Sequence, residues 1–284
     1  MVRWFFALFI LTFSLSIKAE VLFEGYSKVL LGDTHIGFTI QRYEFDPRKK
    51  VFRSISFLRT GPAGGDITES LKTLSDENLV PISYEYTSLA GGKSKTIDAK
   101  FNKGQMTAQV KDSGKSKTIR KDIPKGTFLS NFLIYLIMKS KEGLVVDKRY
   151  GYSAIAEEDA EIFKGDALVE KEEVFKGIPA FKILNRFKEM KFISHVSDRG
   201  EVLGTQSPAN SISTEVVANP QDAIGAFGAS TAILKTLFGD LPAGQKNVIA
   251  QAPATQPSSE KLQGVAPGQG IQIKTAPVPQ EKSK

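Results

Sequence analysis

Apolar and polar residues alternate with a period of two over most of the first two hundred positions of the chain. Between Ile36 and Gln41, for example, an apolar residue occupies every second position. The same alternation recurs in four further runs, over residues 54–57, 82–87, 96–101 and 105–110. Because successive side chains of a strand point to opposite sides, each run predicts a β-strand with one buried and one solvent-facing side.

Short segments rich in glycine, asparagine and aspartate separate these runs. They include Leu31–Thr34, Asp46–Lys49, Asn102–Gly104 and Asp112–Gly114. Glycine and asparagine adopt the positive φ angles that tight hairpins require. Short strands joined by short turns predict a mainly β fold, an antiparallel meander that forms a curved sheet or half-barrel. We expect this domain to span residues 20–218.

One helix is predicted to interrupt the meander, from Phe128 to Ser140, with Thr127 as its N-cap. Nearly every side of this helix is apolar, and such a helix is buried in protein or lies in a membrane. Its 13 residues are too few to span a bilayer, which takes about 20. We therefore expect the helix to fill the concave side of the sheet.

A second helix, rich in glycine and alanine, is predicted from Gln221 to Phe238, within a segment that covers residues 219–241. Two glycines lie inside it, and each costs an isolated helix about 1 kcal/mol relative to alanine. Something must therefore pack on this helix, and the candidates are the sheet of its own domain, a partner protein and lipid. Its own sheet is the simplest of the three.

The two ends of the chain differ from the body. Arg3 precedes an unbroken apolar run from Trp4 to Ile17, and Ala19 follows. This pattern predicts a signal peptide over residues 1–19 that is cleaved after Ala19, because the apolar run of 14 residues is shorter than a spanning helix. Residues 242–284 are rich in proline and glutamine and contain no aromatic residue, which predicts a disordered tail.

Composition narrows the chemistry. The chain has no cysteine, which excludes disulfides, thiolate metal sites, a cysteine nucleophile and a lipobox-type lipid anchor. Two histidines leave little scope for a histidine zinc site. The net charge of +7 indicates a mixed charged surface with a mild attraction to anionic lipid headgroups or polyanions.

Catalytic signatures are missing from the sequence. It contains no GxSxG, HExxH, Walker or dinucleotide-binding motif and no aspartate-rich metal loop. The acidic clusters at 157–161 and 170–173 are interpreted as solvated polar faces, although they could bind a cation or exchange protons. Neither His35 nor His195 has a partner in the sequence that would complete a catalytic triad or a metal site. We therefore predict no enzyme activity, no metal and no cofactor. The alternative is an unrecognised hydrolase that uses Glu170, Glu172, His195 and Asp198.

Residues 93–121 carry nine lysine and arginine side chains. Only Phe101 interleaves with them, which argues against a nucleic-acid surface. A lysine-rich sheet edge that resists aggregation is the favoured interpretation. Attraction to anionic lipid or glycan is the alternative.

The remaining candidate site is apolar. We predict a binding cavity between the sheet and the first helix, because the mouth of a barrel is a common ligand site. A closed, packed core is the alternative, although buried tyrosine hydroxyls need hydrogen-bond partners. The cavity would be lined by Phe38, Ile40, Ile55, Phe57, Tyr84, Tyr86, Phe132, Tyr135 and Leu136.

The order of elements resembles an uncharacterised family of exported Gram-negative proteins, a domain of unknown function. The resemblance rests on Tyr26, the hairpin Gly32–Gly37, the strand entry Asn78–Pro81 and the turn Gly126–Leu129 before the apolar helix, and it covers residues 22–206. It implies a curved antiparallel half-barrel around a helix, similar to the lipoprotein carriers of the periplasm. It implies no catalytic residue.

Export, a curved sheet and an apolar helix together favour a periplasmic binding or scaffolding module of the cell envelope. Its ligand would be an apolar group such as an acyl chain, or a lipoprotein. The alternative is a purely structural envelope-assembly protein that binds an envelope partner through residues 221–284. Peripheral contact with the membrane fits both hypotheses, whereas nucleic acid fits neither.

Overall fold

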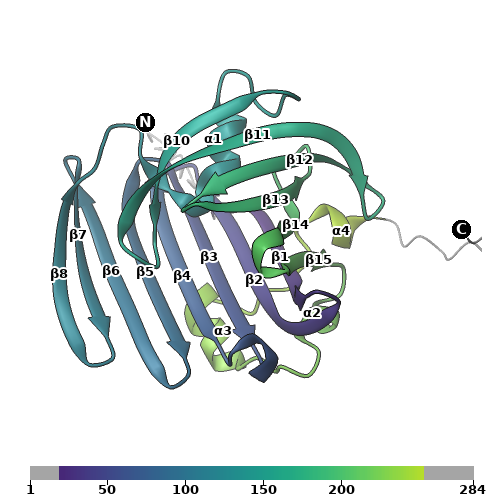
Figure 1. The fold of residues 1–284 in the computed structure, drawn as a ribbon, viewed down its shortest axis with the longest axis horizontal. Helices are drawn as coiled ribbons and strands as arrows, with labels where there is room; N and C mark the ends of the chain where they lie inside the picture. The colour runs from purple at the N-terminus through teal and green to yellow at the C-terminus, as the bar shows by residue number, and fades with distance from the viewer. Residues whose placement is uncertain (1–18, 253–284) are drawn as a thin grey trace, which may run out of the picture. The chain divides into compact units, whose positions relative to one another are not determined.

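One sheet dominates the part of the chain that the structure, a computed structural model, describes, residues 19–252 (Figure 1). Its strands are β1 (Glu20–Leu31), β2 (Thr34–Asp46), β3 (Val51–Thr60), β4 (Thr68–Asp76), β5 (Pro81–Ala90), β6 (Lys93–Asn102), β7 (Gln105–Asp112), β8 (Lys115–Asp122), β9 (Phe128–Leu129), β10 (Arg149–Ala156), β11 (Glu161–Phe175), β12 (Ile178–Phe187), β13 (Met190–Val196), β14 (Val202–Ser207) and β15 (Ile212–Val217). The helices are α1 (Leu133–Lys139), α2 (Pro220–Ile224), α3 (Thr231–Phe238) and α4 (Val248–Gln251), with 3₁₀ turns η1 (Pro62–Gly64), η2 (Ser130–Phe132) and η3 (Pro208–Asn210).

Strand order shows how the sheet is built. From one edge to the other it runs from β8 down to β1, continues with β15, and then runs down to β9. The chain therefore starts in the middle, winds out to one edge, crosses to the opposite edge and winds back. All neighbours are antiparallel except β9 and β10. The predicted mainly β fold, an antiparallel meander forming a curved half-barrel, is confirmed.

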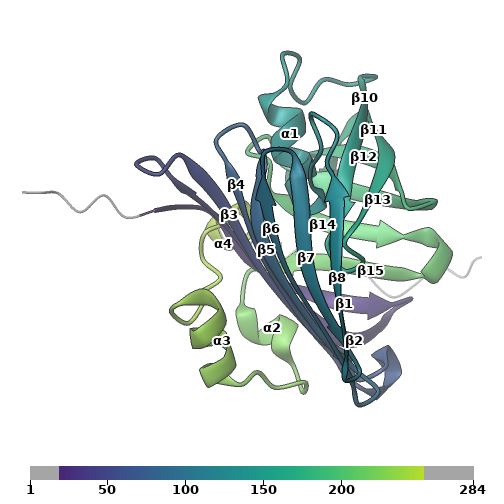
Figure 2. The same ribbon diagram turned by 90° about the vertical axis from the view of Figure 1, so that its left-hand side faces the viewer.

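The crossing from β8 to β9 limits how far apart the two edges can lie. Only residues 123–127 separate these strands, and an extended chain covers at most about 3.6 Å per residue. The near ends of β8 and β9 thus lie within about 22 Å of each other. An ion pair between Lys121 on β8 and Glu161 on β11 bridges the same opening. The sheet is curled back on itself without closing, as Figure 2 shows.

The turns between strands behave as predicted. In the hairpin between β6 and β7, Lys103 and Gly104 both have positive φ angles, of 48° and 77°. A two-residue turn of this kind matches the right-handed twist of the paired strands.

The predicted helix from Phe128 to Ser140 is wrong in its first part. Phe128 and Leu129 form β9, because they pair in parallel with Ala154 and Ile155 of β10, and sheet pairing requires extended backbone. Helix α1 begins only at Leu133, and Leu133 contacts the apolar clusters of both branches of the sheet. The helix therefore fills the concave side of the sheet, as predicted.

The predicted helix from Gln221 to Phe238 is two helices. It breaks at Gly225, whose φ of 51° and ψ of −128° no helix contains, and Gly228 also has a positive φ. Both helices pack on the sheet of their own domain, with Ala223 of α2 and Leu234 and Phe238 of α3 buried there.

The predicted tail begins as an ordered segment. Asn247 has no exposed surface, and its side-chain amide donates to the Glu24 carbonyl at 2.9 Å. Tyr26 donates its hydroxyl proton to the Pro242 carbonyl at 3.0 Å. The rest of that prediction, residues 253–284, lies outside the described residues, as does the predicted signal peptide except Ala19. Within residues 19–252, no helix is long and apolar enough to cross a bilayer.

Gly225 offers a test of the break between α2 and α3. An alanine there would be forced into a conformation that side chains avoid, and its Cβ would lie 3.3 Å from Cε1 of His35. We expect Gly225→Ala to lower the free energy of unfolding by about 1–3 kcal/mol in urea denaturation. Gly151→Ala is the matched control, because a Cβ there meets nothing within 4 Å. Equal effects of the two substitutions would contradict the strained geometry.

Candidate functional site

The nine residues predicted to line one cavity lie in two apolar clusters on opposite faces of the sheet. Register places Phe57 opposite Ile40 and Ile55 opposite Arg42, on the face that α2 and α3 cover. The cluster under α2 and α3 contains Phe38, Ile40, Ile55 and Phe57, and the cluster around α1 contains Tyr84, Tyr86, Phe132, Tyr135 and Leu136. The single predicted cavity is therefore wrong. Strands β2 and β3 contribute residues to both clusters, and alternation within one strand does not show which residues of the next strand lie on the same face.

A polar row crosses the inner face of the sheet. Register aligns the side chains of Tyr43, Ser54, Thr73 and Tyr84 on β2 to β5. Residues just before α1 contact this row: the Asn131 amide donates to Thr73 Oγ1 at 2.9 Å, and Tyr43 donates to the Asn131 carbonyl at 3.0 Å. These bonds fix the start of α1 against the inner face.

Glu157, from the predicted acidic cluster, is buried beside this row. Its Oε2 accepts a hydrogen bond from Ser130 Oγ at 2.6 Å. Burial raises the pKa of Glu157 to about 7. Burial, followed by the charge of Glu157, also raises the pKa of Tyr84. The Glu157 carboxyl can therefore gain or lose a proton near neutral pH, as a general acid or base does.

Several polar atoms in this region have no partner. Among the described residues, buried atoms without a hydrogen bond include Ser75 Oγ, Tyr84 OH, Asn131 Oδ1 and Glu157 Oε1. Glu157 lines neither of the two surface pockets described below. Glu157 is therefore part of the polar core between the sheet and α1.

The residues of the hydrolase alternative are engaged separately. His195 Nε2 lies 2.7 Å from Glu173 Oε1, and its ring stacks on Phe175 with 4.2 Å between ring centres. Burial lowers the pKa of His195. Glu170 pairs instead with Lys182 at 2.8 Å. Within residues 19–252, no group of three or more histidine, aspartate or glutamate side chains is arranged to hold a metal.

An apolar groove of about 500 Å³ runs between α3 and strands β3 to β5. Ile233 on α3 and Leu89 on β5 border it and are 50% and 47% exposed, whereas Phe57 at its base is buried. Lys72 also lines the groove, with its amine 4.0 Å from Glu85 Oε2. The remaining lining residues are Thr68, Glu69, Ser70, Thr87, Ala232, Thr236 and Leu237.

Buried charge fixes the wall of this groove. Arg42, on the same face, donates to the carbonyl of Phe238 at the end of α3 at 3.1 Å. The guanidinium also pairs with Asp240 at 2.7 Å and with Glu24 at 2.5 Å. Glu24 in turn accepts a hydrogen bond from the Gly244 amide at 2.7 Å. The helix that forms the wall is thus tied to β1 and β2 at its C-terminal end.

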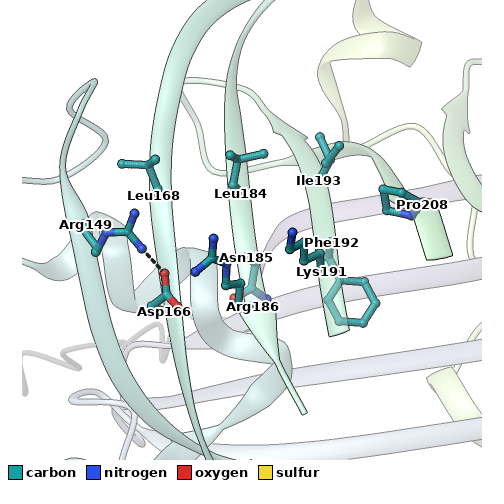
Figure 3. Close-up of a pocket in the computed structure, with 10 residues that line it drawn as sticks. All are labelled: Arg149, Asp166, Leu168, Leu184, Asn185, Arg186, Lys191, Phe192, Ile193 and Pro208. Carbon is teal, nitrogen blue, oxygen red and sulfur yellow. Dashed lines mark hydrogen bonds and ion pairs between the residues drawn. The ribbon is translucent and has the colours of Figure 1, made fainter. Parts of the chain in front are cut away.

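A second pocket, of about 210 Å³, lies on the face of β10 to β13 away from α1 (Figure 3). Leu168, Leu184 and Ile193 lie in one row across β11, β12 and β13. Four charged residues line the same pocket, Arg149, Asp166, Arg186 and Lys191. The opposite face of these strands holds the buried residues Ala167, Val169 and Ile183, which pack on α1.

Of the residues that line the two pockets, only Phe57 was predicted from the sequence as a site residue. Leu168, Leu184 and Ile193 are far apart in sequence, so only the strand register shows that they are neighbours. Ile233 directly precedes Leu234, a buried residue of α3, and the break at Gly225 had to be known before its face could be assigned.

The described residues form a barrel-like module, an open half-barrel with an apolar groove beside α3. A family model described as "Protein of unknown function (DUF3108)" matches residues 22–183, and the chain belongs to this family. Among solved structures, it is similar to the "Beta-barrel-like Protein of Domain of Unknown Function DUF1849 from Brucella abortus", with 12% identity and a TM-score of 0.47 over 69% of this chain and 96% of that one. Among curated proteins, no sequence matches.

Glu157 predicts a pH dependence of stability. Its folded-state pKa of about 7 lies above the ordinary value of 4.5, so the folded state binds the proton more tightly than the unfolded state. Stability should therefore fall as pH rises from about 4.5 to about 7, by roughly 3 kcal/mol in all. Glu157→Gln keeps the neutral form and should abolish this part of the decline.

The measurement is urea denaturation of wild type and variant at about pH 5 and about pH 8. Glu172→Gln, at an exposed glutamate of β11, is the control and should keep the wild-type pH dependence. An unchanged pH dependence in Glu157→Gln would show that the carboxyl does not titrate as described.

Proposed function

We propose that this protein is an exported binding module of the cell envelope that holds an acyl chain in the groove beside α3. The observation that carries the proposal is the groove itself, whose volume of about 500 Å³ falls within the usual range for small-molecule sites, about 300–1,000 Å³. Its borders expose apolar side chains to water, and covering them is favourable.

An acyl chain fits the shape and chemistry of the groove better than a compact polar ligand does. The groove is open and bordered by aliphatic side chains, and Lys72, which lines it, can pair with a carboxylate or phosphate headgroup. Export is supported by the predicted signal peptide. Location in the periplasm rests on the resemblance to exported Gram-negative proteins.

Chain length should control affinity. Each buried methylene contributes about 0.8 kcal/mol, and association costs at least about 4 kcal/mol in lost freedom. Micromolar binding, about 8 kcal/mol, thus needs about fifteen buried methylenes. A long acyl chain meets this requirement, whereas a short one does not.

We therefore expect the dissociation constant of fatty acids to fall by up to about fifteenfold for every two added methylenes until the groove is full. Displacement of the fluorescent fatty acid cis-parinaric acid measures this series. Ile233→Glu places a charge at the border of the groove and should weaken binding at least about tenfold. Val174→Glu is the control, since Val174 is 72% exposed on β11 and lies outside the groove.

Native mass spectrometry of protein purified gently from its own envelope provides the second readout. A retained lipid mass that disappears in Ile233→Glu supports the proposal. A co-purifying protein that Ile233→Glu releases would instead support assembly through α3. Affinity that does not depend on chain length, or equal effects of both variants, would refute the acyl-chain site.

A further inference from the structure

The outer face of β10 to β13 carries an apolar row that residues 19–252 leave partly exposed. Leu168, Leu184 and Ile193 are register partners on three adjacent strands, so their side chains lie side by side, as Figure 3 shows. All three are partly exposed, and the exposed Pro208 borders the same pocket. The other face of these strands packs on α1, which leaves this row facing outward.

A row of charged residues runs beside the apolar row on the same face. Each of its members lies two positions from the aliphatic residue of the same strand. Register pairs Asp166 with Arg186 and Arg186 with Lys191. Asp166 is neutralised by its ion pair with Arg149. Arg186 and Lys191 are exposed, and neither forms an ion pair within residues 19–252. The surface therefore presents two uncompensated cations next to partly exposed aliphatic side chains.

We propose that this face, defined by Leu168, Leu184, Ile193, Arg186 and Lys191, docks on an anionic lipid bilayer. The cations attract lipid phosphates, with about a fivefold gain in affinity for each residue near the membrane surface. The aliphatic row enters the boundary between headgroups and acyl chains. Charge and apolar surface thus act on the same occupant.

Two alternatives fit the surface less well. The pocket of about 210 Å³ is smaller than the usual small-molecule site of about 300–1,000 Å³, so an enclosed ligand would be poorly covered. A stable protein partner needs about 800 Å² of contact on each side, with a central apolar core. Three partly exposed aliphatic residues and one proline supply little of that, whereas at a bilayer a small apolar area adds to the attraction between cations and anionic lipid.

The lysine-rich strands β6 to β8 are the competing basic surface. They contain more cations, of which two are compensated: Lys121 pairs with Glu161, and Lys95 lies 3.9 Å from Asp159. The register of β6 and β7 also places Asp98 among the cations on one face of these strands. This surface supplies the matched control, because charge reversal there changes the net charge by the same amount.

The test is co-sedimentation of the mature full-length protein with vesicles. Vesicles of phosphatidylcholine alone are compared with vesicles of equal parts phosphatidylcholine and phosphatidylglycerol. We expect binding to the anionic vesicles only, and less of it as ionic strength rises.

The variant Arg186→Glu/Lys191→Glu should lower the partition coefficient at least about tenfold. The control Lys100→Glu/Lys111→Glu should lower it less than about threefold. The milder Arg186→Gln/Lys191→Gln, with an intermediate loss, guards against a folding defect in the reversal variant.

Insertion of the apolar row is measured separately with Pro208→Trp. The single tryptophan of the chain, Trp4, lies in the predicted signal peptide, so the new residue is the only reporter in the mature protein. We expect its emission to shift to shorter wavelength on anionic vesicles. Equal losses for the two reversal pairs, absence of vesicle binding, or binding without the emission shift would overturn the proposal. Ile233→Glu should leave vesicle binding unchanged, which separates this surface from the acyl-chain groove.

Discussion

The pairing of β1 with β15 is the constraint on which the rest of this structure depends. Six residues of β1, Tyr26 to Leu31, pair with Ile212 to Val217 in the middle of the sheet. The other strand pairs of the described sheet join neighbours in sequence, so this is the strand pairing that joins two branches that wind outward in opposite directions. Contacts between such distant segments are slow to form, because the entropy of closing a long loop must be overcome first.

The same strand organises the C-terminal segment. Glu24 and Tyr26 project from β1 toward the face under α2 and α3, where they bind the backbone at Gly244 and Pro242. Arg42 lies between Glu24 and Asp240 and caps the end of α3. A buried ion pair adds little net stability. Removing one partner, however, leaves an uncompensated buried charge and lowers the free energy of unfolding by about 3–5 kcal/mol. The position of α3, and so the width of the groove, is therefore fixed by paired charges as well as by apolar packing.

How much the sequence could predict depends on whether a feature is local. Alternation around Phe38 and Ile40 and the Lys103-Gly104 turn are local, and they gave the strands and hairpins correctly. Phe128 and Leu129 continue a helical pattern but pair with a strand that lies later in the chain, which no local pattern records.

Composition was equally misleading where a few specific contacts decide the structure. Asn247 lies in a segment whose proline and glutamine content predicts disorder. Its side-chain nitrogen and its side-chain oxygen nevertheless both form hydrogen bonds with the backbone. The prediction of a single cavity was wrong for a related reason, because strand register brings together the residues of each pocket. Alternation shows that a side chain is on one face of its strand, but the neighbouring strand decides what it meets there.

The two branches of the sheet also separate the two proposed surfaces. The groove is built on β3 to β5 and α3, and the membrane-docking face on β10 to β13. The family match at residues 22–183 includes the floor of the groove but not α3, which forms its wall. A substitution in α3 can therefore alter the wall while leaving the matched strands intact. Because Arg42 holds the end of α3 through a backbone carbonyl, it does so whatever side chains the helix carries, so the helix can change its lining residues without losing its anchor.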